Sequence, residues 1–163
     1  MEQHNETRAI IDRAKAQLAE FYNGNSWVTD NFHDRVFGMK DDEALQKVPG
    51  HHHTVAQLTA HITAWRNFAL QKIAGHDGYD ILEESSDWPV AHDWNAVCDD
   101  FKTCHINLLS AIENFPLDRW ESRVPGRNYS FLYLIYGIIQ HDYYHYGQIG
   151  SVIAGIKELR AKG

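Results

Sequence analysis

The sequence predicts an all-α protein, a four-helix up-and-down bundle, and two observations support this fold class. Four long segments carry apolar residues at intervals of three and four, the period that places them on one face of an α-helix. We find no convincing β-strand, and the stretches between the segments are short or rich in Gly, Pro and Asp. Since each helix has one apolar stripe to bury, the four are expected to pack against one another.

The first long helix is expected at about residues 7–23. Apolar residues between Ile10 and Tyr22 recur at helical spacing, and Gly24 follows as a natural stop. A loop-rich stretch comes next and ends at Pro49 and Gly50. Short helices are expected within it, near residues 30–37 and 41–47.

The second long helix begins at a capping box. Thr54 is followed three residues later by Gln57, so each side chain can bond the other residue's backbone N–H. Gly75 ends this helix, and a turn-rich connection runs to about residue 92. Its apolar stripe consists of Val55, Leu58, Ile62, Trp65, Phe68 and Ala69.

The third and fourth helices are expected at about residues 93–115 and from Ser130 to about residue 158. In the third, apolar residues repeat at four and three, which is typical of a bundle seam, and Pro116 closes it. Ser130 is a good N-cap for the fourth. Nothing marks a second domain, so residues 1–163 are expected to form one.

The composition excludes several classes of protein. The net charge is −7 and no cluster of Lys and Arg occurs, so a nucleic-acid partner is not expected. No apolar run reaches the roughly 20 residues of a membrane span, and the polar, acidic first residues do not resemble a signal peptide. The two cysteines, Cys98 and Cys104, cannot easily bridge on one helix and favour a reducing, cytoplasmic setting.

His141 and His145 are the most informative pair in the sequence. Four residues apart on the fourth helix, they share one face with Cβ atoms about 5–6 Å apart. That spacing allows two imidazoles to reach one metal ion at about 2.0–2.1 Å. Both interrupt an otherwise apolar, inward-facing stripe, so a metal or hydrogen-bond partners must compensate their burial.

His61 is the candidate for a third ligand. It lies between Leu58 and Trp65 on the buried face of the second helix. Three inward histidines on two helices favour a metal site, although neutral, hydrogen-bonded core histidines are the alternative. Three ligands without an evident carboxylate leave a coordination position open, which is typical of catalytic sites. Imidazole suits Zn, Ni, Cu and Fe, so the ligands do not select the metal.

Neighbouring residues receive supporting roles. Gln148, one turn beyond His145, is placed to bond a ligand ring or a bound water. Asp142 lies about 100° around the helix from His141, so a role at the surface or between helices is at least as well supported as a role at the site. Gly147 would permit close helix packing beside the histidines. Tyr129, Tyr144 and Trp65 are candidates for a pocket wall, though aromatic residues at this spacing are more often part of the core.

The chain resembles the DinB/YfiT-like superfamily. The segment Ile139–Ile149, with two histidines separated by three residues and followed by Gly-Gln-Ile, is similar to the signature of that family's last helix. The segment Thr54–Ile62 is similar to its second-helix signature, in which a histidine follows a polar-capped run ending in Leu and two further residues. The helix order agrees as well.

This resemblance implies a four-helix bundle that holds a divalent metal (Zn, Ni or Fe) through His61, His141 and His145. It also implies a homodimer that acts on a small molecule. Characterised relatives include transferases and an isomerase that depend on low-molecular-weight thiols such as bacillithiol or mycothiol, and many members have no known reaction. The chain departs from the usual pattern at residues 51–53, three consecutive histidines, of which His53 is a candidate pocket residue or fourth ligand.

Three functions remain open at this point. The first is a metal-dependent transferase that attacks a small electrophile with a thiol, and a metal-dependent hydrolase is its close alternative. The second is a non-catalytic metal-binding or stress-response protein. The third is a plain helical bundle whose buried histidines are neutral and hydrogen-bonded.

Overall fold

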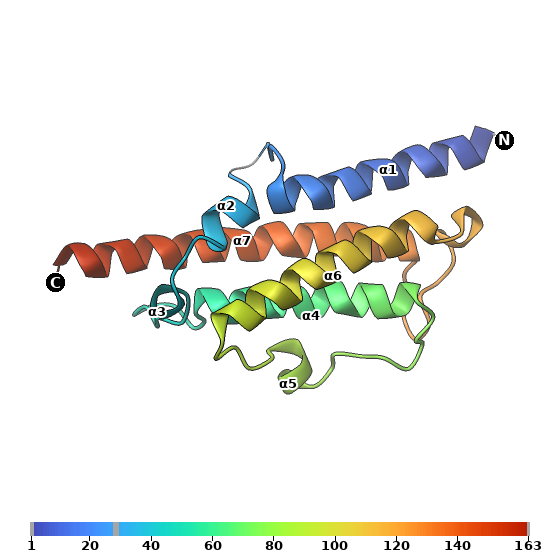
Figure 1. Cartoon of the computed structure of the whole chain (residues 1–163). Helices are drawn as coiled ribbons and strands as arrows, with labels where there is room; N and C mark the ends of the chain where they lie inside the picture. Colours follow the sequence, from blue (N-terminus) through green and yellow to red (C-terminus); the bar gives the residue numbers. More distant parts are fainter. Residues whose placement is uncertain (1, 28–29, 163) are drawn as a thin grey trace.

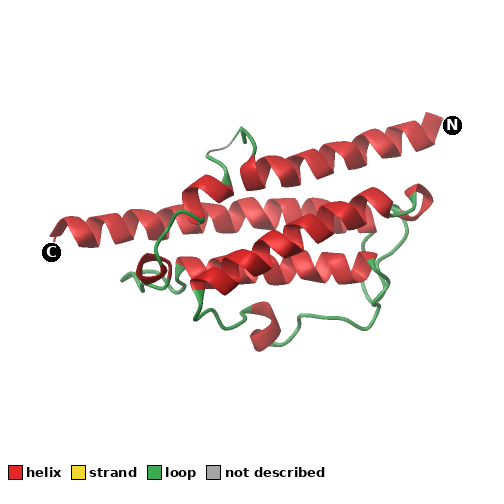
Figure 2. Ribbon diagram, in the orientation of Figure 1, coloured by secondary structure: helices red, strands yellow, loops and turns green. Residues whose placement is uncertain are grey.

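The chain is described over residues 2–27 and 30–162 by a computed structural model, and within these ranges it contains helices and no β-strand (Figure 2). This confirms the all-α class. The long helices are α1 (Glu2–Asn23), α4 (Val55–Ile73), α6 (Trp94–Asn114) and α7 (Phe131–Lys162). Short helices α2 (Phe32–Val36) and α3 (Asp41–Ala44) fall where the sequence predicts them, whereas α5 (Glu84–Asp87) and a 3-10 turn (Leu117–Arg119) were not expected.

Side-chain caps fix the starts of three long helices. Thr54 Oγ1 accepts a hydrogen bond from the Gln57 N–H at 3.2 Å, and Gln57 Oε1 accepts one from the Thr54 N–H at 3.0 Å, which completes the predicted capping box of α4. Asp93 caps α6 by accepting from the Ala96 N–H at 3.1 Å. Ser130 accepts from the N–H of Tyr133 at the start of α7. These bonds satisfy backbone donors that have no partner within their helices.

The directions of the helices differ from a simple up-and-down order. Helices α4 and α6 run in the same direction, and α1 and α7 both run opposite to them (Figure 1). Residues 74–93 therefore form a crossover that returns along the whole length of α4 and carries α5 (Figure 1). Helix α4 packs against α6 and α7, and α1 packs against α7 and α6. A crossover of this length is what parallel neighbours in a bundle require.

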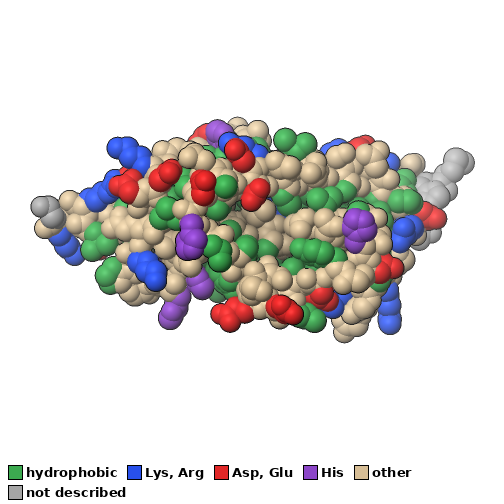
Figure 3. Space-filling view, turned by 60° about the horizontal axis from the view of Figure 1, so that its bottom comes forward, with side chains coloured by type: hydrophobic (Ala, Val, Ile, Leu, Met, Phe, Trp, Pro, Cys, Tyr) green, Lys and Arg blue, Asp and Glu red, His purple; other side chains and the backbone are tan. Residues whose placement is uncertain are grey.

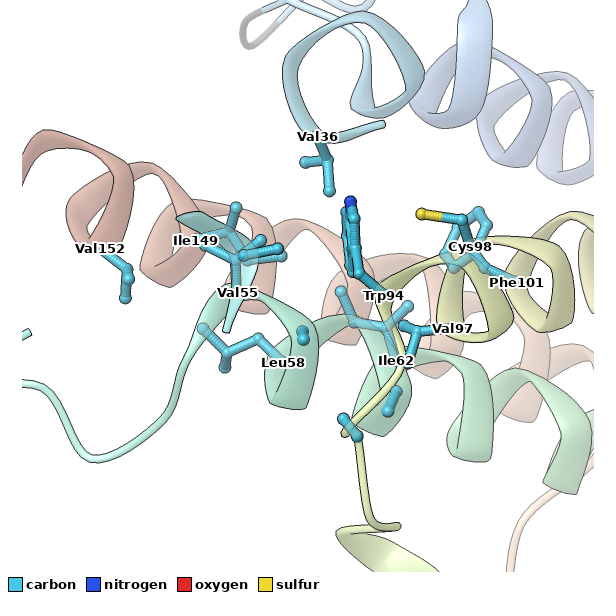
Figure 4. Close-up of a cluster of buried hydrophobic side chains, with 14 of the residues drawn as sticks. Val36, Val55, Leu58, Ile62, Trp94, Val97, Cys98, Phe101, Ile149 and Val152 are labelled. Atoms are coloured by element: carbon cyan, nitrogen blue, oxygen red, sulfur yellow. The ribbon is translucent and has the colours of Figure 1, made fainter. Parts of the chain in front are cut away.

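The apolar core is divided into two clusters along the bundle axis. The first joins the C-terminal end of α1, the short helices α2 and α3, the beginnings of α4 and α6, and the second half of α7. Figure 4 shows members of this cluster from α2, α4, α6 and α7. The second joins the rest of α1, the ends of α4 and α6, and the first half of α7. Trp94 and Trp120, 2% and 0% exposed, are the largest side chains of the first and second cluster respectively.

The outer surface is mixed in character. Figure 3 shows acidic side chains spread over one face, hydrophobic side chains between them, and histidines that reach the surface at separate points. None of the helices described here combines the length and the apolar character needed to cross a bilayer.

Replacing the cap of α4 tests this account of local structure. Thr54→Ala is expected to lower the free energy of unfolding by about 1 kcal/mol, because the N–H of Gln57 loses its acceptor. Urea unfolding measures the change. Thr103→Ala, at an exposed position within α6, is the control and should leave stability within about 0.5 kcal/mol of the parent. Equal effects of the two substitutions would contradict the role of the cap.

Candidate metal centre

Three histidine side chains from two helices meet inside the bundle. His61 comes from α4, and His141 and His145 come from consecutive turns of α7. The Nε2 atom of His61 lies 3.0 Å from that of His145 and 3.1 Å from that of His141. Two nitrogens bound to one ion at about 2.0–2.1 Å lie roughly 3.0–3.4 Å apart, so these separations fit a shared cation. Among the described residues, no other group of His, Cys, Asp or Glu converges in this way.

Hydrogen bonds on the outer side of two rings decide which nitrogen carries the proton. His61 Nδ1 lies 2.7 Å from the backbone carbonyl oxygen of Asp87, and His145 Nδ1 lies 2.8 Å from the side-chain oxygen of Gln148. Both oxygens are acceptors, so both Nδ1 atoms donate, and in neutral rings both Nε2 atoms carry lone pairs. Two lone pairs 3.0 Å apart repel each other unless a cation lies between them. The donor set therefore fits a metal ion.

Burial favours the neutral form of two of these rings, His141 and His145. His61 and His145 are 4% and 7% exposed, and His141 is half-buried. Burial, with smaller contributions from the other two histidines and Arg66, lowers the pKa of His141 to about 3. Burial also lowers the pKa of His145. Neutral imidazole is the form that binds a metal. The buried Nδ1 of His141 has no hydrogen-bond partner among the described residues.

Trp88 separates His53 from the three converging rings. Its indole stacks on His61 with ring centroids 3.8 Å apart, and His53 stacks on the same indole at 3.7 Å. Both imidazoles are nearly parallel to the indole, at 7° and 9°, so they occupy opposite faces of it. His53 therefore lines the surroundings of the site and does not join the ligand set.

The crossover supplies Asp87 and Trp88, which no spacing in the sequence marks. Besides its carbonyl contact with His61, Asp87 accepts a hydrogen bond from Trp65 Nε1 at 2.7 Å through its carboxylate. The ring of Trp65 lies 5.2 Å from that of His141 between centroids. Trp65 thus lines the site and ties the crossover to α4.

Three other residues singled out in the sequence lie at different distances from the site. Tyr144 is 65% exposed and meets His145 edge-on, with ring centroids 4.9 Å apart. Tyr129 precedes α7, where its ring packs against Tyr133, so it does not line the site. Gly147 is exposed, and a Cβ atom there would meet nothing within 4 Å. Close packing within the chain is therefore not the reason for this glycine.

A buried ionic cluster lies next to the histidines. Arg66 and Asp142 are both 0% exposed, which places Asp142 in the interior. Arg66 donates to Asp142 Oδ2 through Nε at 3.0 Å and Nη2 at 2.7 Å, and through Nη1 to His105 Nδ1 at 2.8 Å. Because a guanidinium only donates, His105 Nδ1 is the acceptor. Burial and the charge of Arg66 lower the pKa of His105 to about 3. His105 was not recognised from the sequence.

Comparison with protein-family models places the chain in a known group. The model described as the DinB superfamily matches residues 25–149, which include all three converging histidines. This chain belongs to the DinB superfamily. Searches of curated proteins and of solved structures find no match. Membership of the DinB superfamily confirms the resemblance seen in the two histidine motifs, and it leaves the reaction to be argued from the site.

The buried histidines predict acid sensitivity of the metal-free protein. With a chelator present, the free energy of unfolding should fall as the pH decreases from 7 to 5. Native His105 and His141 have pKa values near 3, whereas unfolded histidine titrates near 6.5, so below that pH the unfolded chain binds more protons. Burial raises the pKa of Asp142 to about 6 despite Arg66, and this single carboxyl opposes the two histidines without cancelling them. Urea unfolding at pH 7, 6 and 5 measures the trend, and equal or higher stability at pH 5 would contradict it.

Proposed function

We propose that this protein is a metal-dependent enzyme of the transferase class that joins a low-molecular-weight thiol to a small electrophile. The observation that carries the proposal is the convergence of the Nε2 atoms of His61, His141 and His145. Among the described residues, no Cys, Asp or Glu completes this set. Three protein ligands are typical of catalytic metal sites, whereas structural sites are closed by four.

A divalent ion such as Zn²⁺, Ni²⁺ or Fe²⁺, when bound there, would supply Lewis acidity and favour loss of a proton from a coordinated thiol or water. The chain's own residues prepare the ligands. Asp87 and Gln148 hold the Nδ1 atoms of two rings, which aims their Nε2 atoms inward. Trp88 covers one face of His61 and excludes water from it.

The nucleophile is proposed to come from outside the chain. Cys98 and Cys104 are the only cysteines, both are free and buried, and burial raises the pKa of each to about 11. At neutral pH they are protonated and poorly nucleophilic. In the proposed transfer, the sulfur of a small thiol forms a bond to an electrophilic carbon. Its proton passes to solvent, and the leaving group departs with its electron pair.

The surroundings of the site bear on the size of the substrate and on the source of a base. A hollow of about 240 Å³ lies near the site, and its lining includes Gln148, which bonds His145 Nδ1, and His53, but none of the three converging histidines. A bound metal would promote proton loss from water as well as from a thiol, so the choice of a thiol rests on the resemblance to thiol-dependent DinB-like proteins. The carboxylate of Asp87 already accepts a hydrogen bond from Trp65 and lies 3.2 Å from the outer nitrogen of His61. It therefore faces away from the converging Nε2 atoms.

The proposal extends to the setting of the protein. Two free cysteines suit the reducing cytoplasm, and the net charge of −7 disfavours a nucleic-acid partner. The resemblance to DinB-like proteins supports a homodimer that binds a small molecule.

Metal removal gives the first test. Protein purified without a tag should carry about one divalent ion per chain, measured by plasma mass spectrometry. At about 1,000 times the dissociation constant the ion should add about 4 kcal/mol of stability, so a chelator at pH 7.5 should lower the melting temperature by roughly 8–16 °C. His145→Ala should lose most of the metal, and His76→Ala, at an exposed position, should keep it. Full metal content in His145→Ala would contradict the ligand assignment.

Turnover gives the second test. The metal-loaded protein should accelerate the reaction of a bacillithiol-type or mycothiol-type thiol with a reactive halide. The loss of free thiol over time measures the rate. His61→Ala should abolish the acceleration because one ligand is lost, while His76→Ala should retain it. Metal binding without turnover of any thiol tested would favour the non-catalytic alternative. Hydrolysis of an activated ester without thiol would favour the hydrolase.

A further inference from the structure

Arg66 contacts all three of the other long helices. Its guanidinium bonds Asp142 on α7 and His105 on α6. Its faces are covered by two aromatic rings, with its Cζ atom 5.1 Å from the ring centroid of Phe21 on α1 and 4.7 Å from that of Phe101 on α6. Every described helix longer than five residues therefore meets this one group.

Net stability is a weak reason for this arrangement. Removing two charges from water costs free energy that a buried ion pair only partly recovers, and apolar replacements of similar volume are often neutral or stabilising. The pairing is also incomplete, because Asp142 Oδ1 is buried and has no hydrogen-bond partner among the described residues. A geometric role accounts for the pair better than a stabilising one.

The pair joins the two helices that carry the converging histidines. Arg66 follows His61 by five residues on α4, and Asp142 directly follows His141 on α7. A two-bond contact from a planar guanidinium to one carboxylate oxygen tolerates little rotation or sliding of either helix. A shift of one residue along α7 would turn its face by about 100° and move its imidazoles away from His61.

We propose that Arg66 and Asp142 are positioning residues, whose ion pair fixes the rotation and axial register of α7 against α4 and thereby holds the three imidazoles at metal-binding separations. This inference rests on the proposed function, since it requires a metal at His61, His141 and His145.

Charge and position can be separated experimentally. Asp142 neutralises Arg66, so Asp142→Asn would leave an uncompensated positive charge beside the site and weaken cation binding through electrostatics alone. The double substitution Arg66→Met with Asp142→Leu removes both charges and leaves the net charge unchanged. A change in metal binding by the double variant therefore reports on the positions of the three histidines and not on a change in charge.

Cobalt titration of the double variant is the test. The metal-free protein is titrated with Co²⁺ at pH 7.5, and the visible absorption bands of the bound ion report its coordination geometry. We expect the dissociation constant to rise by about 10–100-fold, the range found for residues that orient metal ligands, and the bands at saturation to shift. Helical content should be retained. Arg66→Lys keeps the charge and loses the two-bond contact, so it should shift the absorption bands in the same direction. This single variant also provides a test if the double variant fails to fold.

Lys72→Met is the matched control. Lys72 is a second buried cation on α4, 2% exposed, which donates to the Asp77 carbonyl oxygen at 2.6 Å and lies eleven residues beyond His61. It should alter stability and leave cobalt affinity and spectrum unchanged. Parental affinity and spectrum in the folded double variant and in Arg66→Lys would overturn the inference while leaving the metal site intact. A parent protein that binds no cobalt would overturn the proposed function and this inference together.

Discussion

Arg66 places a permanent positive charge where the long helices meet, and the bundle can close only if that charge is neutralised and its donors are satisfied. Asp142 supplies the negative charge, His105 accepts a further hydrogen bond, and aromatic rings from α1 and α6 cover the faces of the guanidinium. The cluster fixes how all four helices meet. It also brings the middle of α4 against the middle of α7, where the three histidines lie.

The histidine site follows from the same constraint. Neutral imidazole rings whose Nδ1 atoms donate to oxygen, as in His61 and His145, must direct their Nε2 lone pairs inward. The crossover between α4 and α6 completes the arrangement, because its path along α4 places Asp87 and Trp88 against His61. Two helices and one connection thus produce a three-nitrogen set that suits a divalent cation.

Much of this was readable in the sequence. The four long helices follow from apolar spacing, and the burial of His61, His141 and His145 follows from their places within apolar stripes. The parallel course of α4 and α6 was missed, although the length of the connection indicated it: antiparallel neighbours need only a few residues, and residues 74–93 are enough to return along a whole helix. With the crossover missed, Asp87 and Trp88 could not be placed.

The sequence indicates the buried ionic cluster less clearly than it indicates the three histidines. Arg66 falls at core spacing with Ile62 and Ala69, and Asp142 falls at core spacing with Ile138 and Ile149. Opposite charges within two apolar stripes indicate a buried pair only once the register of the helices is known, and that register depends on the three-dimensional packing.

The central claim is that one cation is held by three imidazoles. X-ray absorption spectroscopy of the protein loaded with one equivalent of zinc tests it most directly. The account predicts a first shell containing three imidazole nitrogens at about 2.0–2.1 Å, with one remaining position filled by a non-protein ligand. A shell built from carboxylate or water oxygens without imidazole scattering would contradict the account.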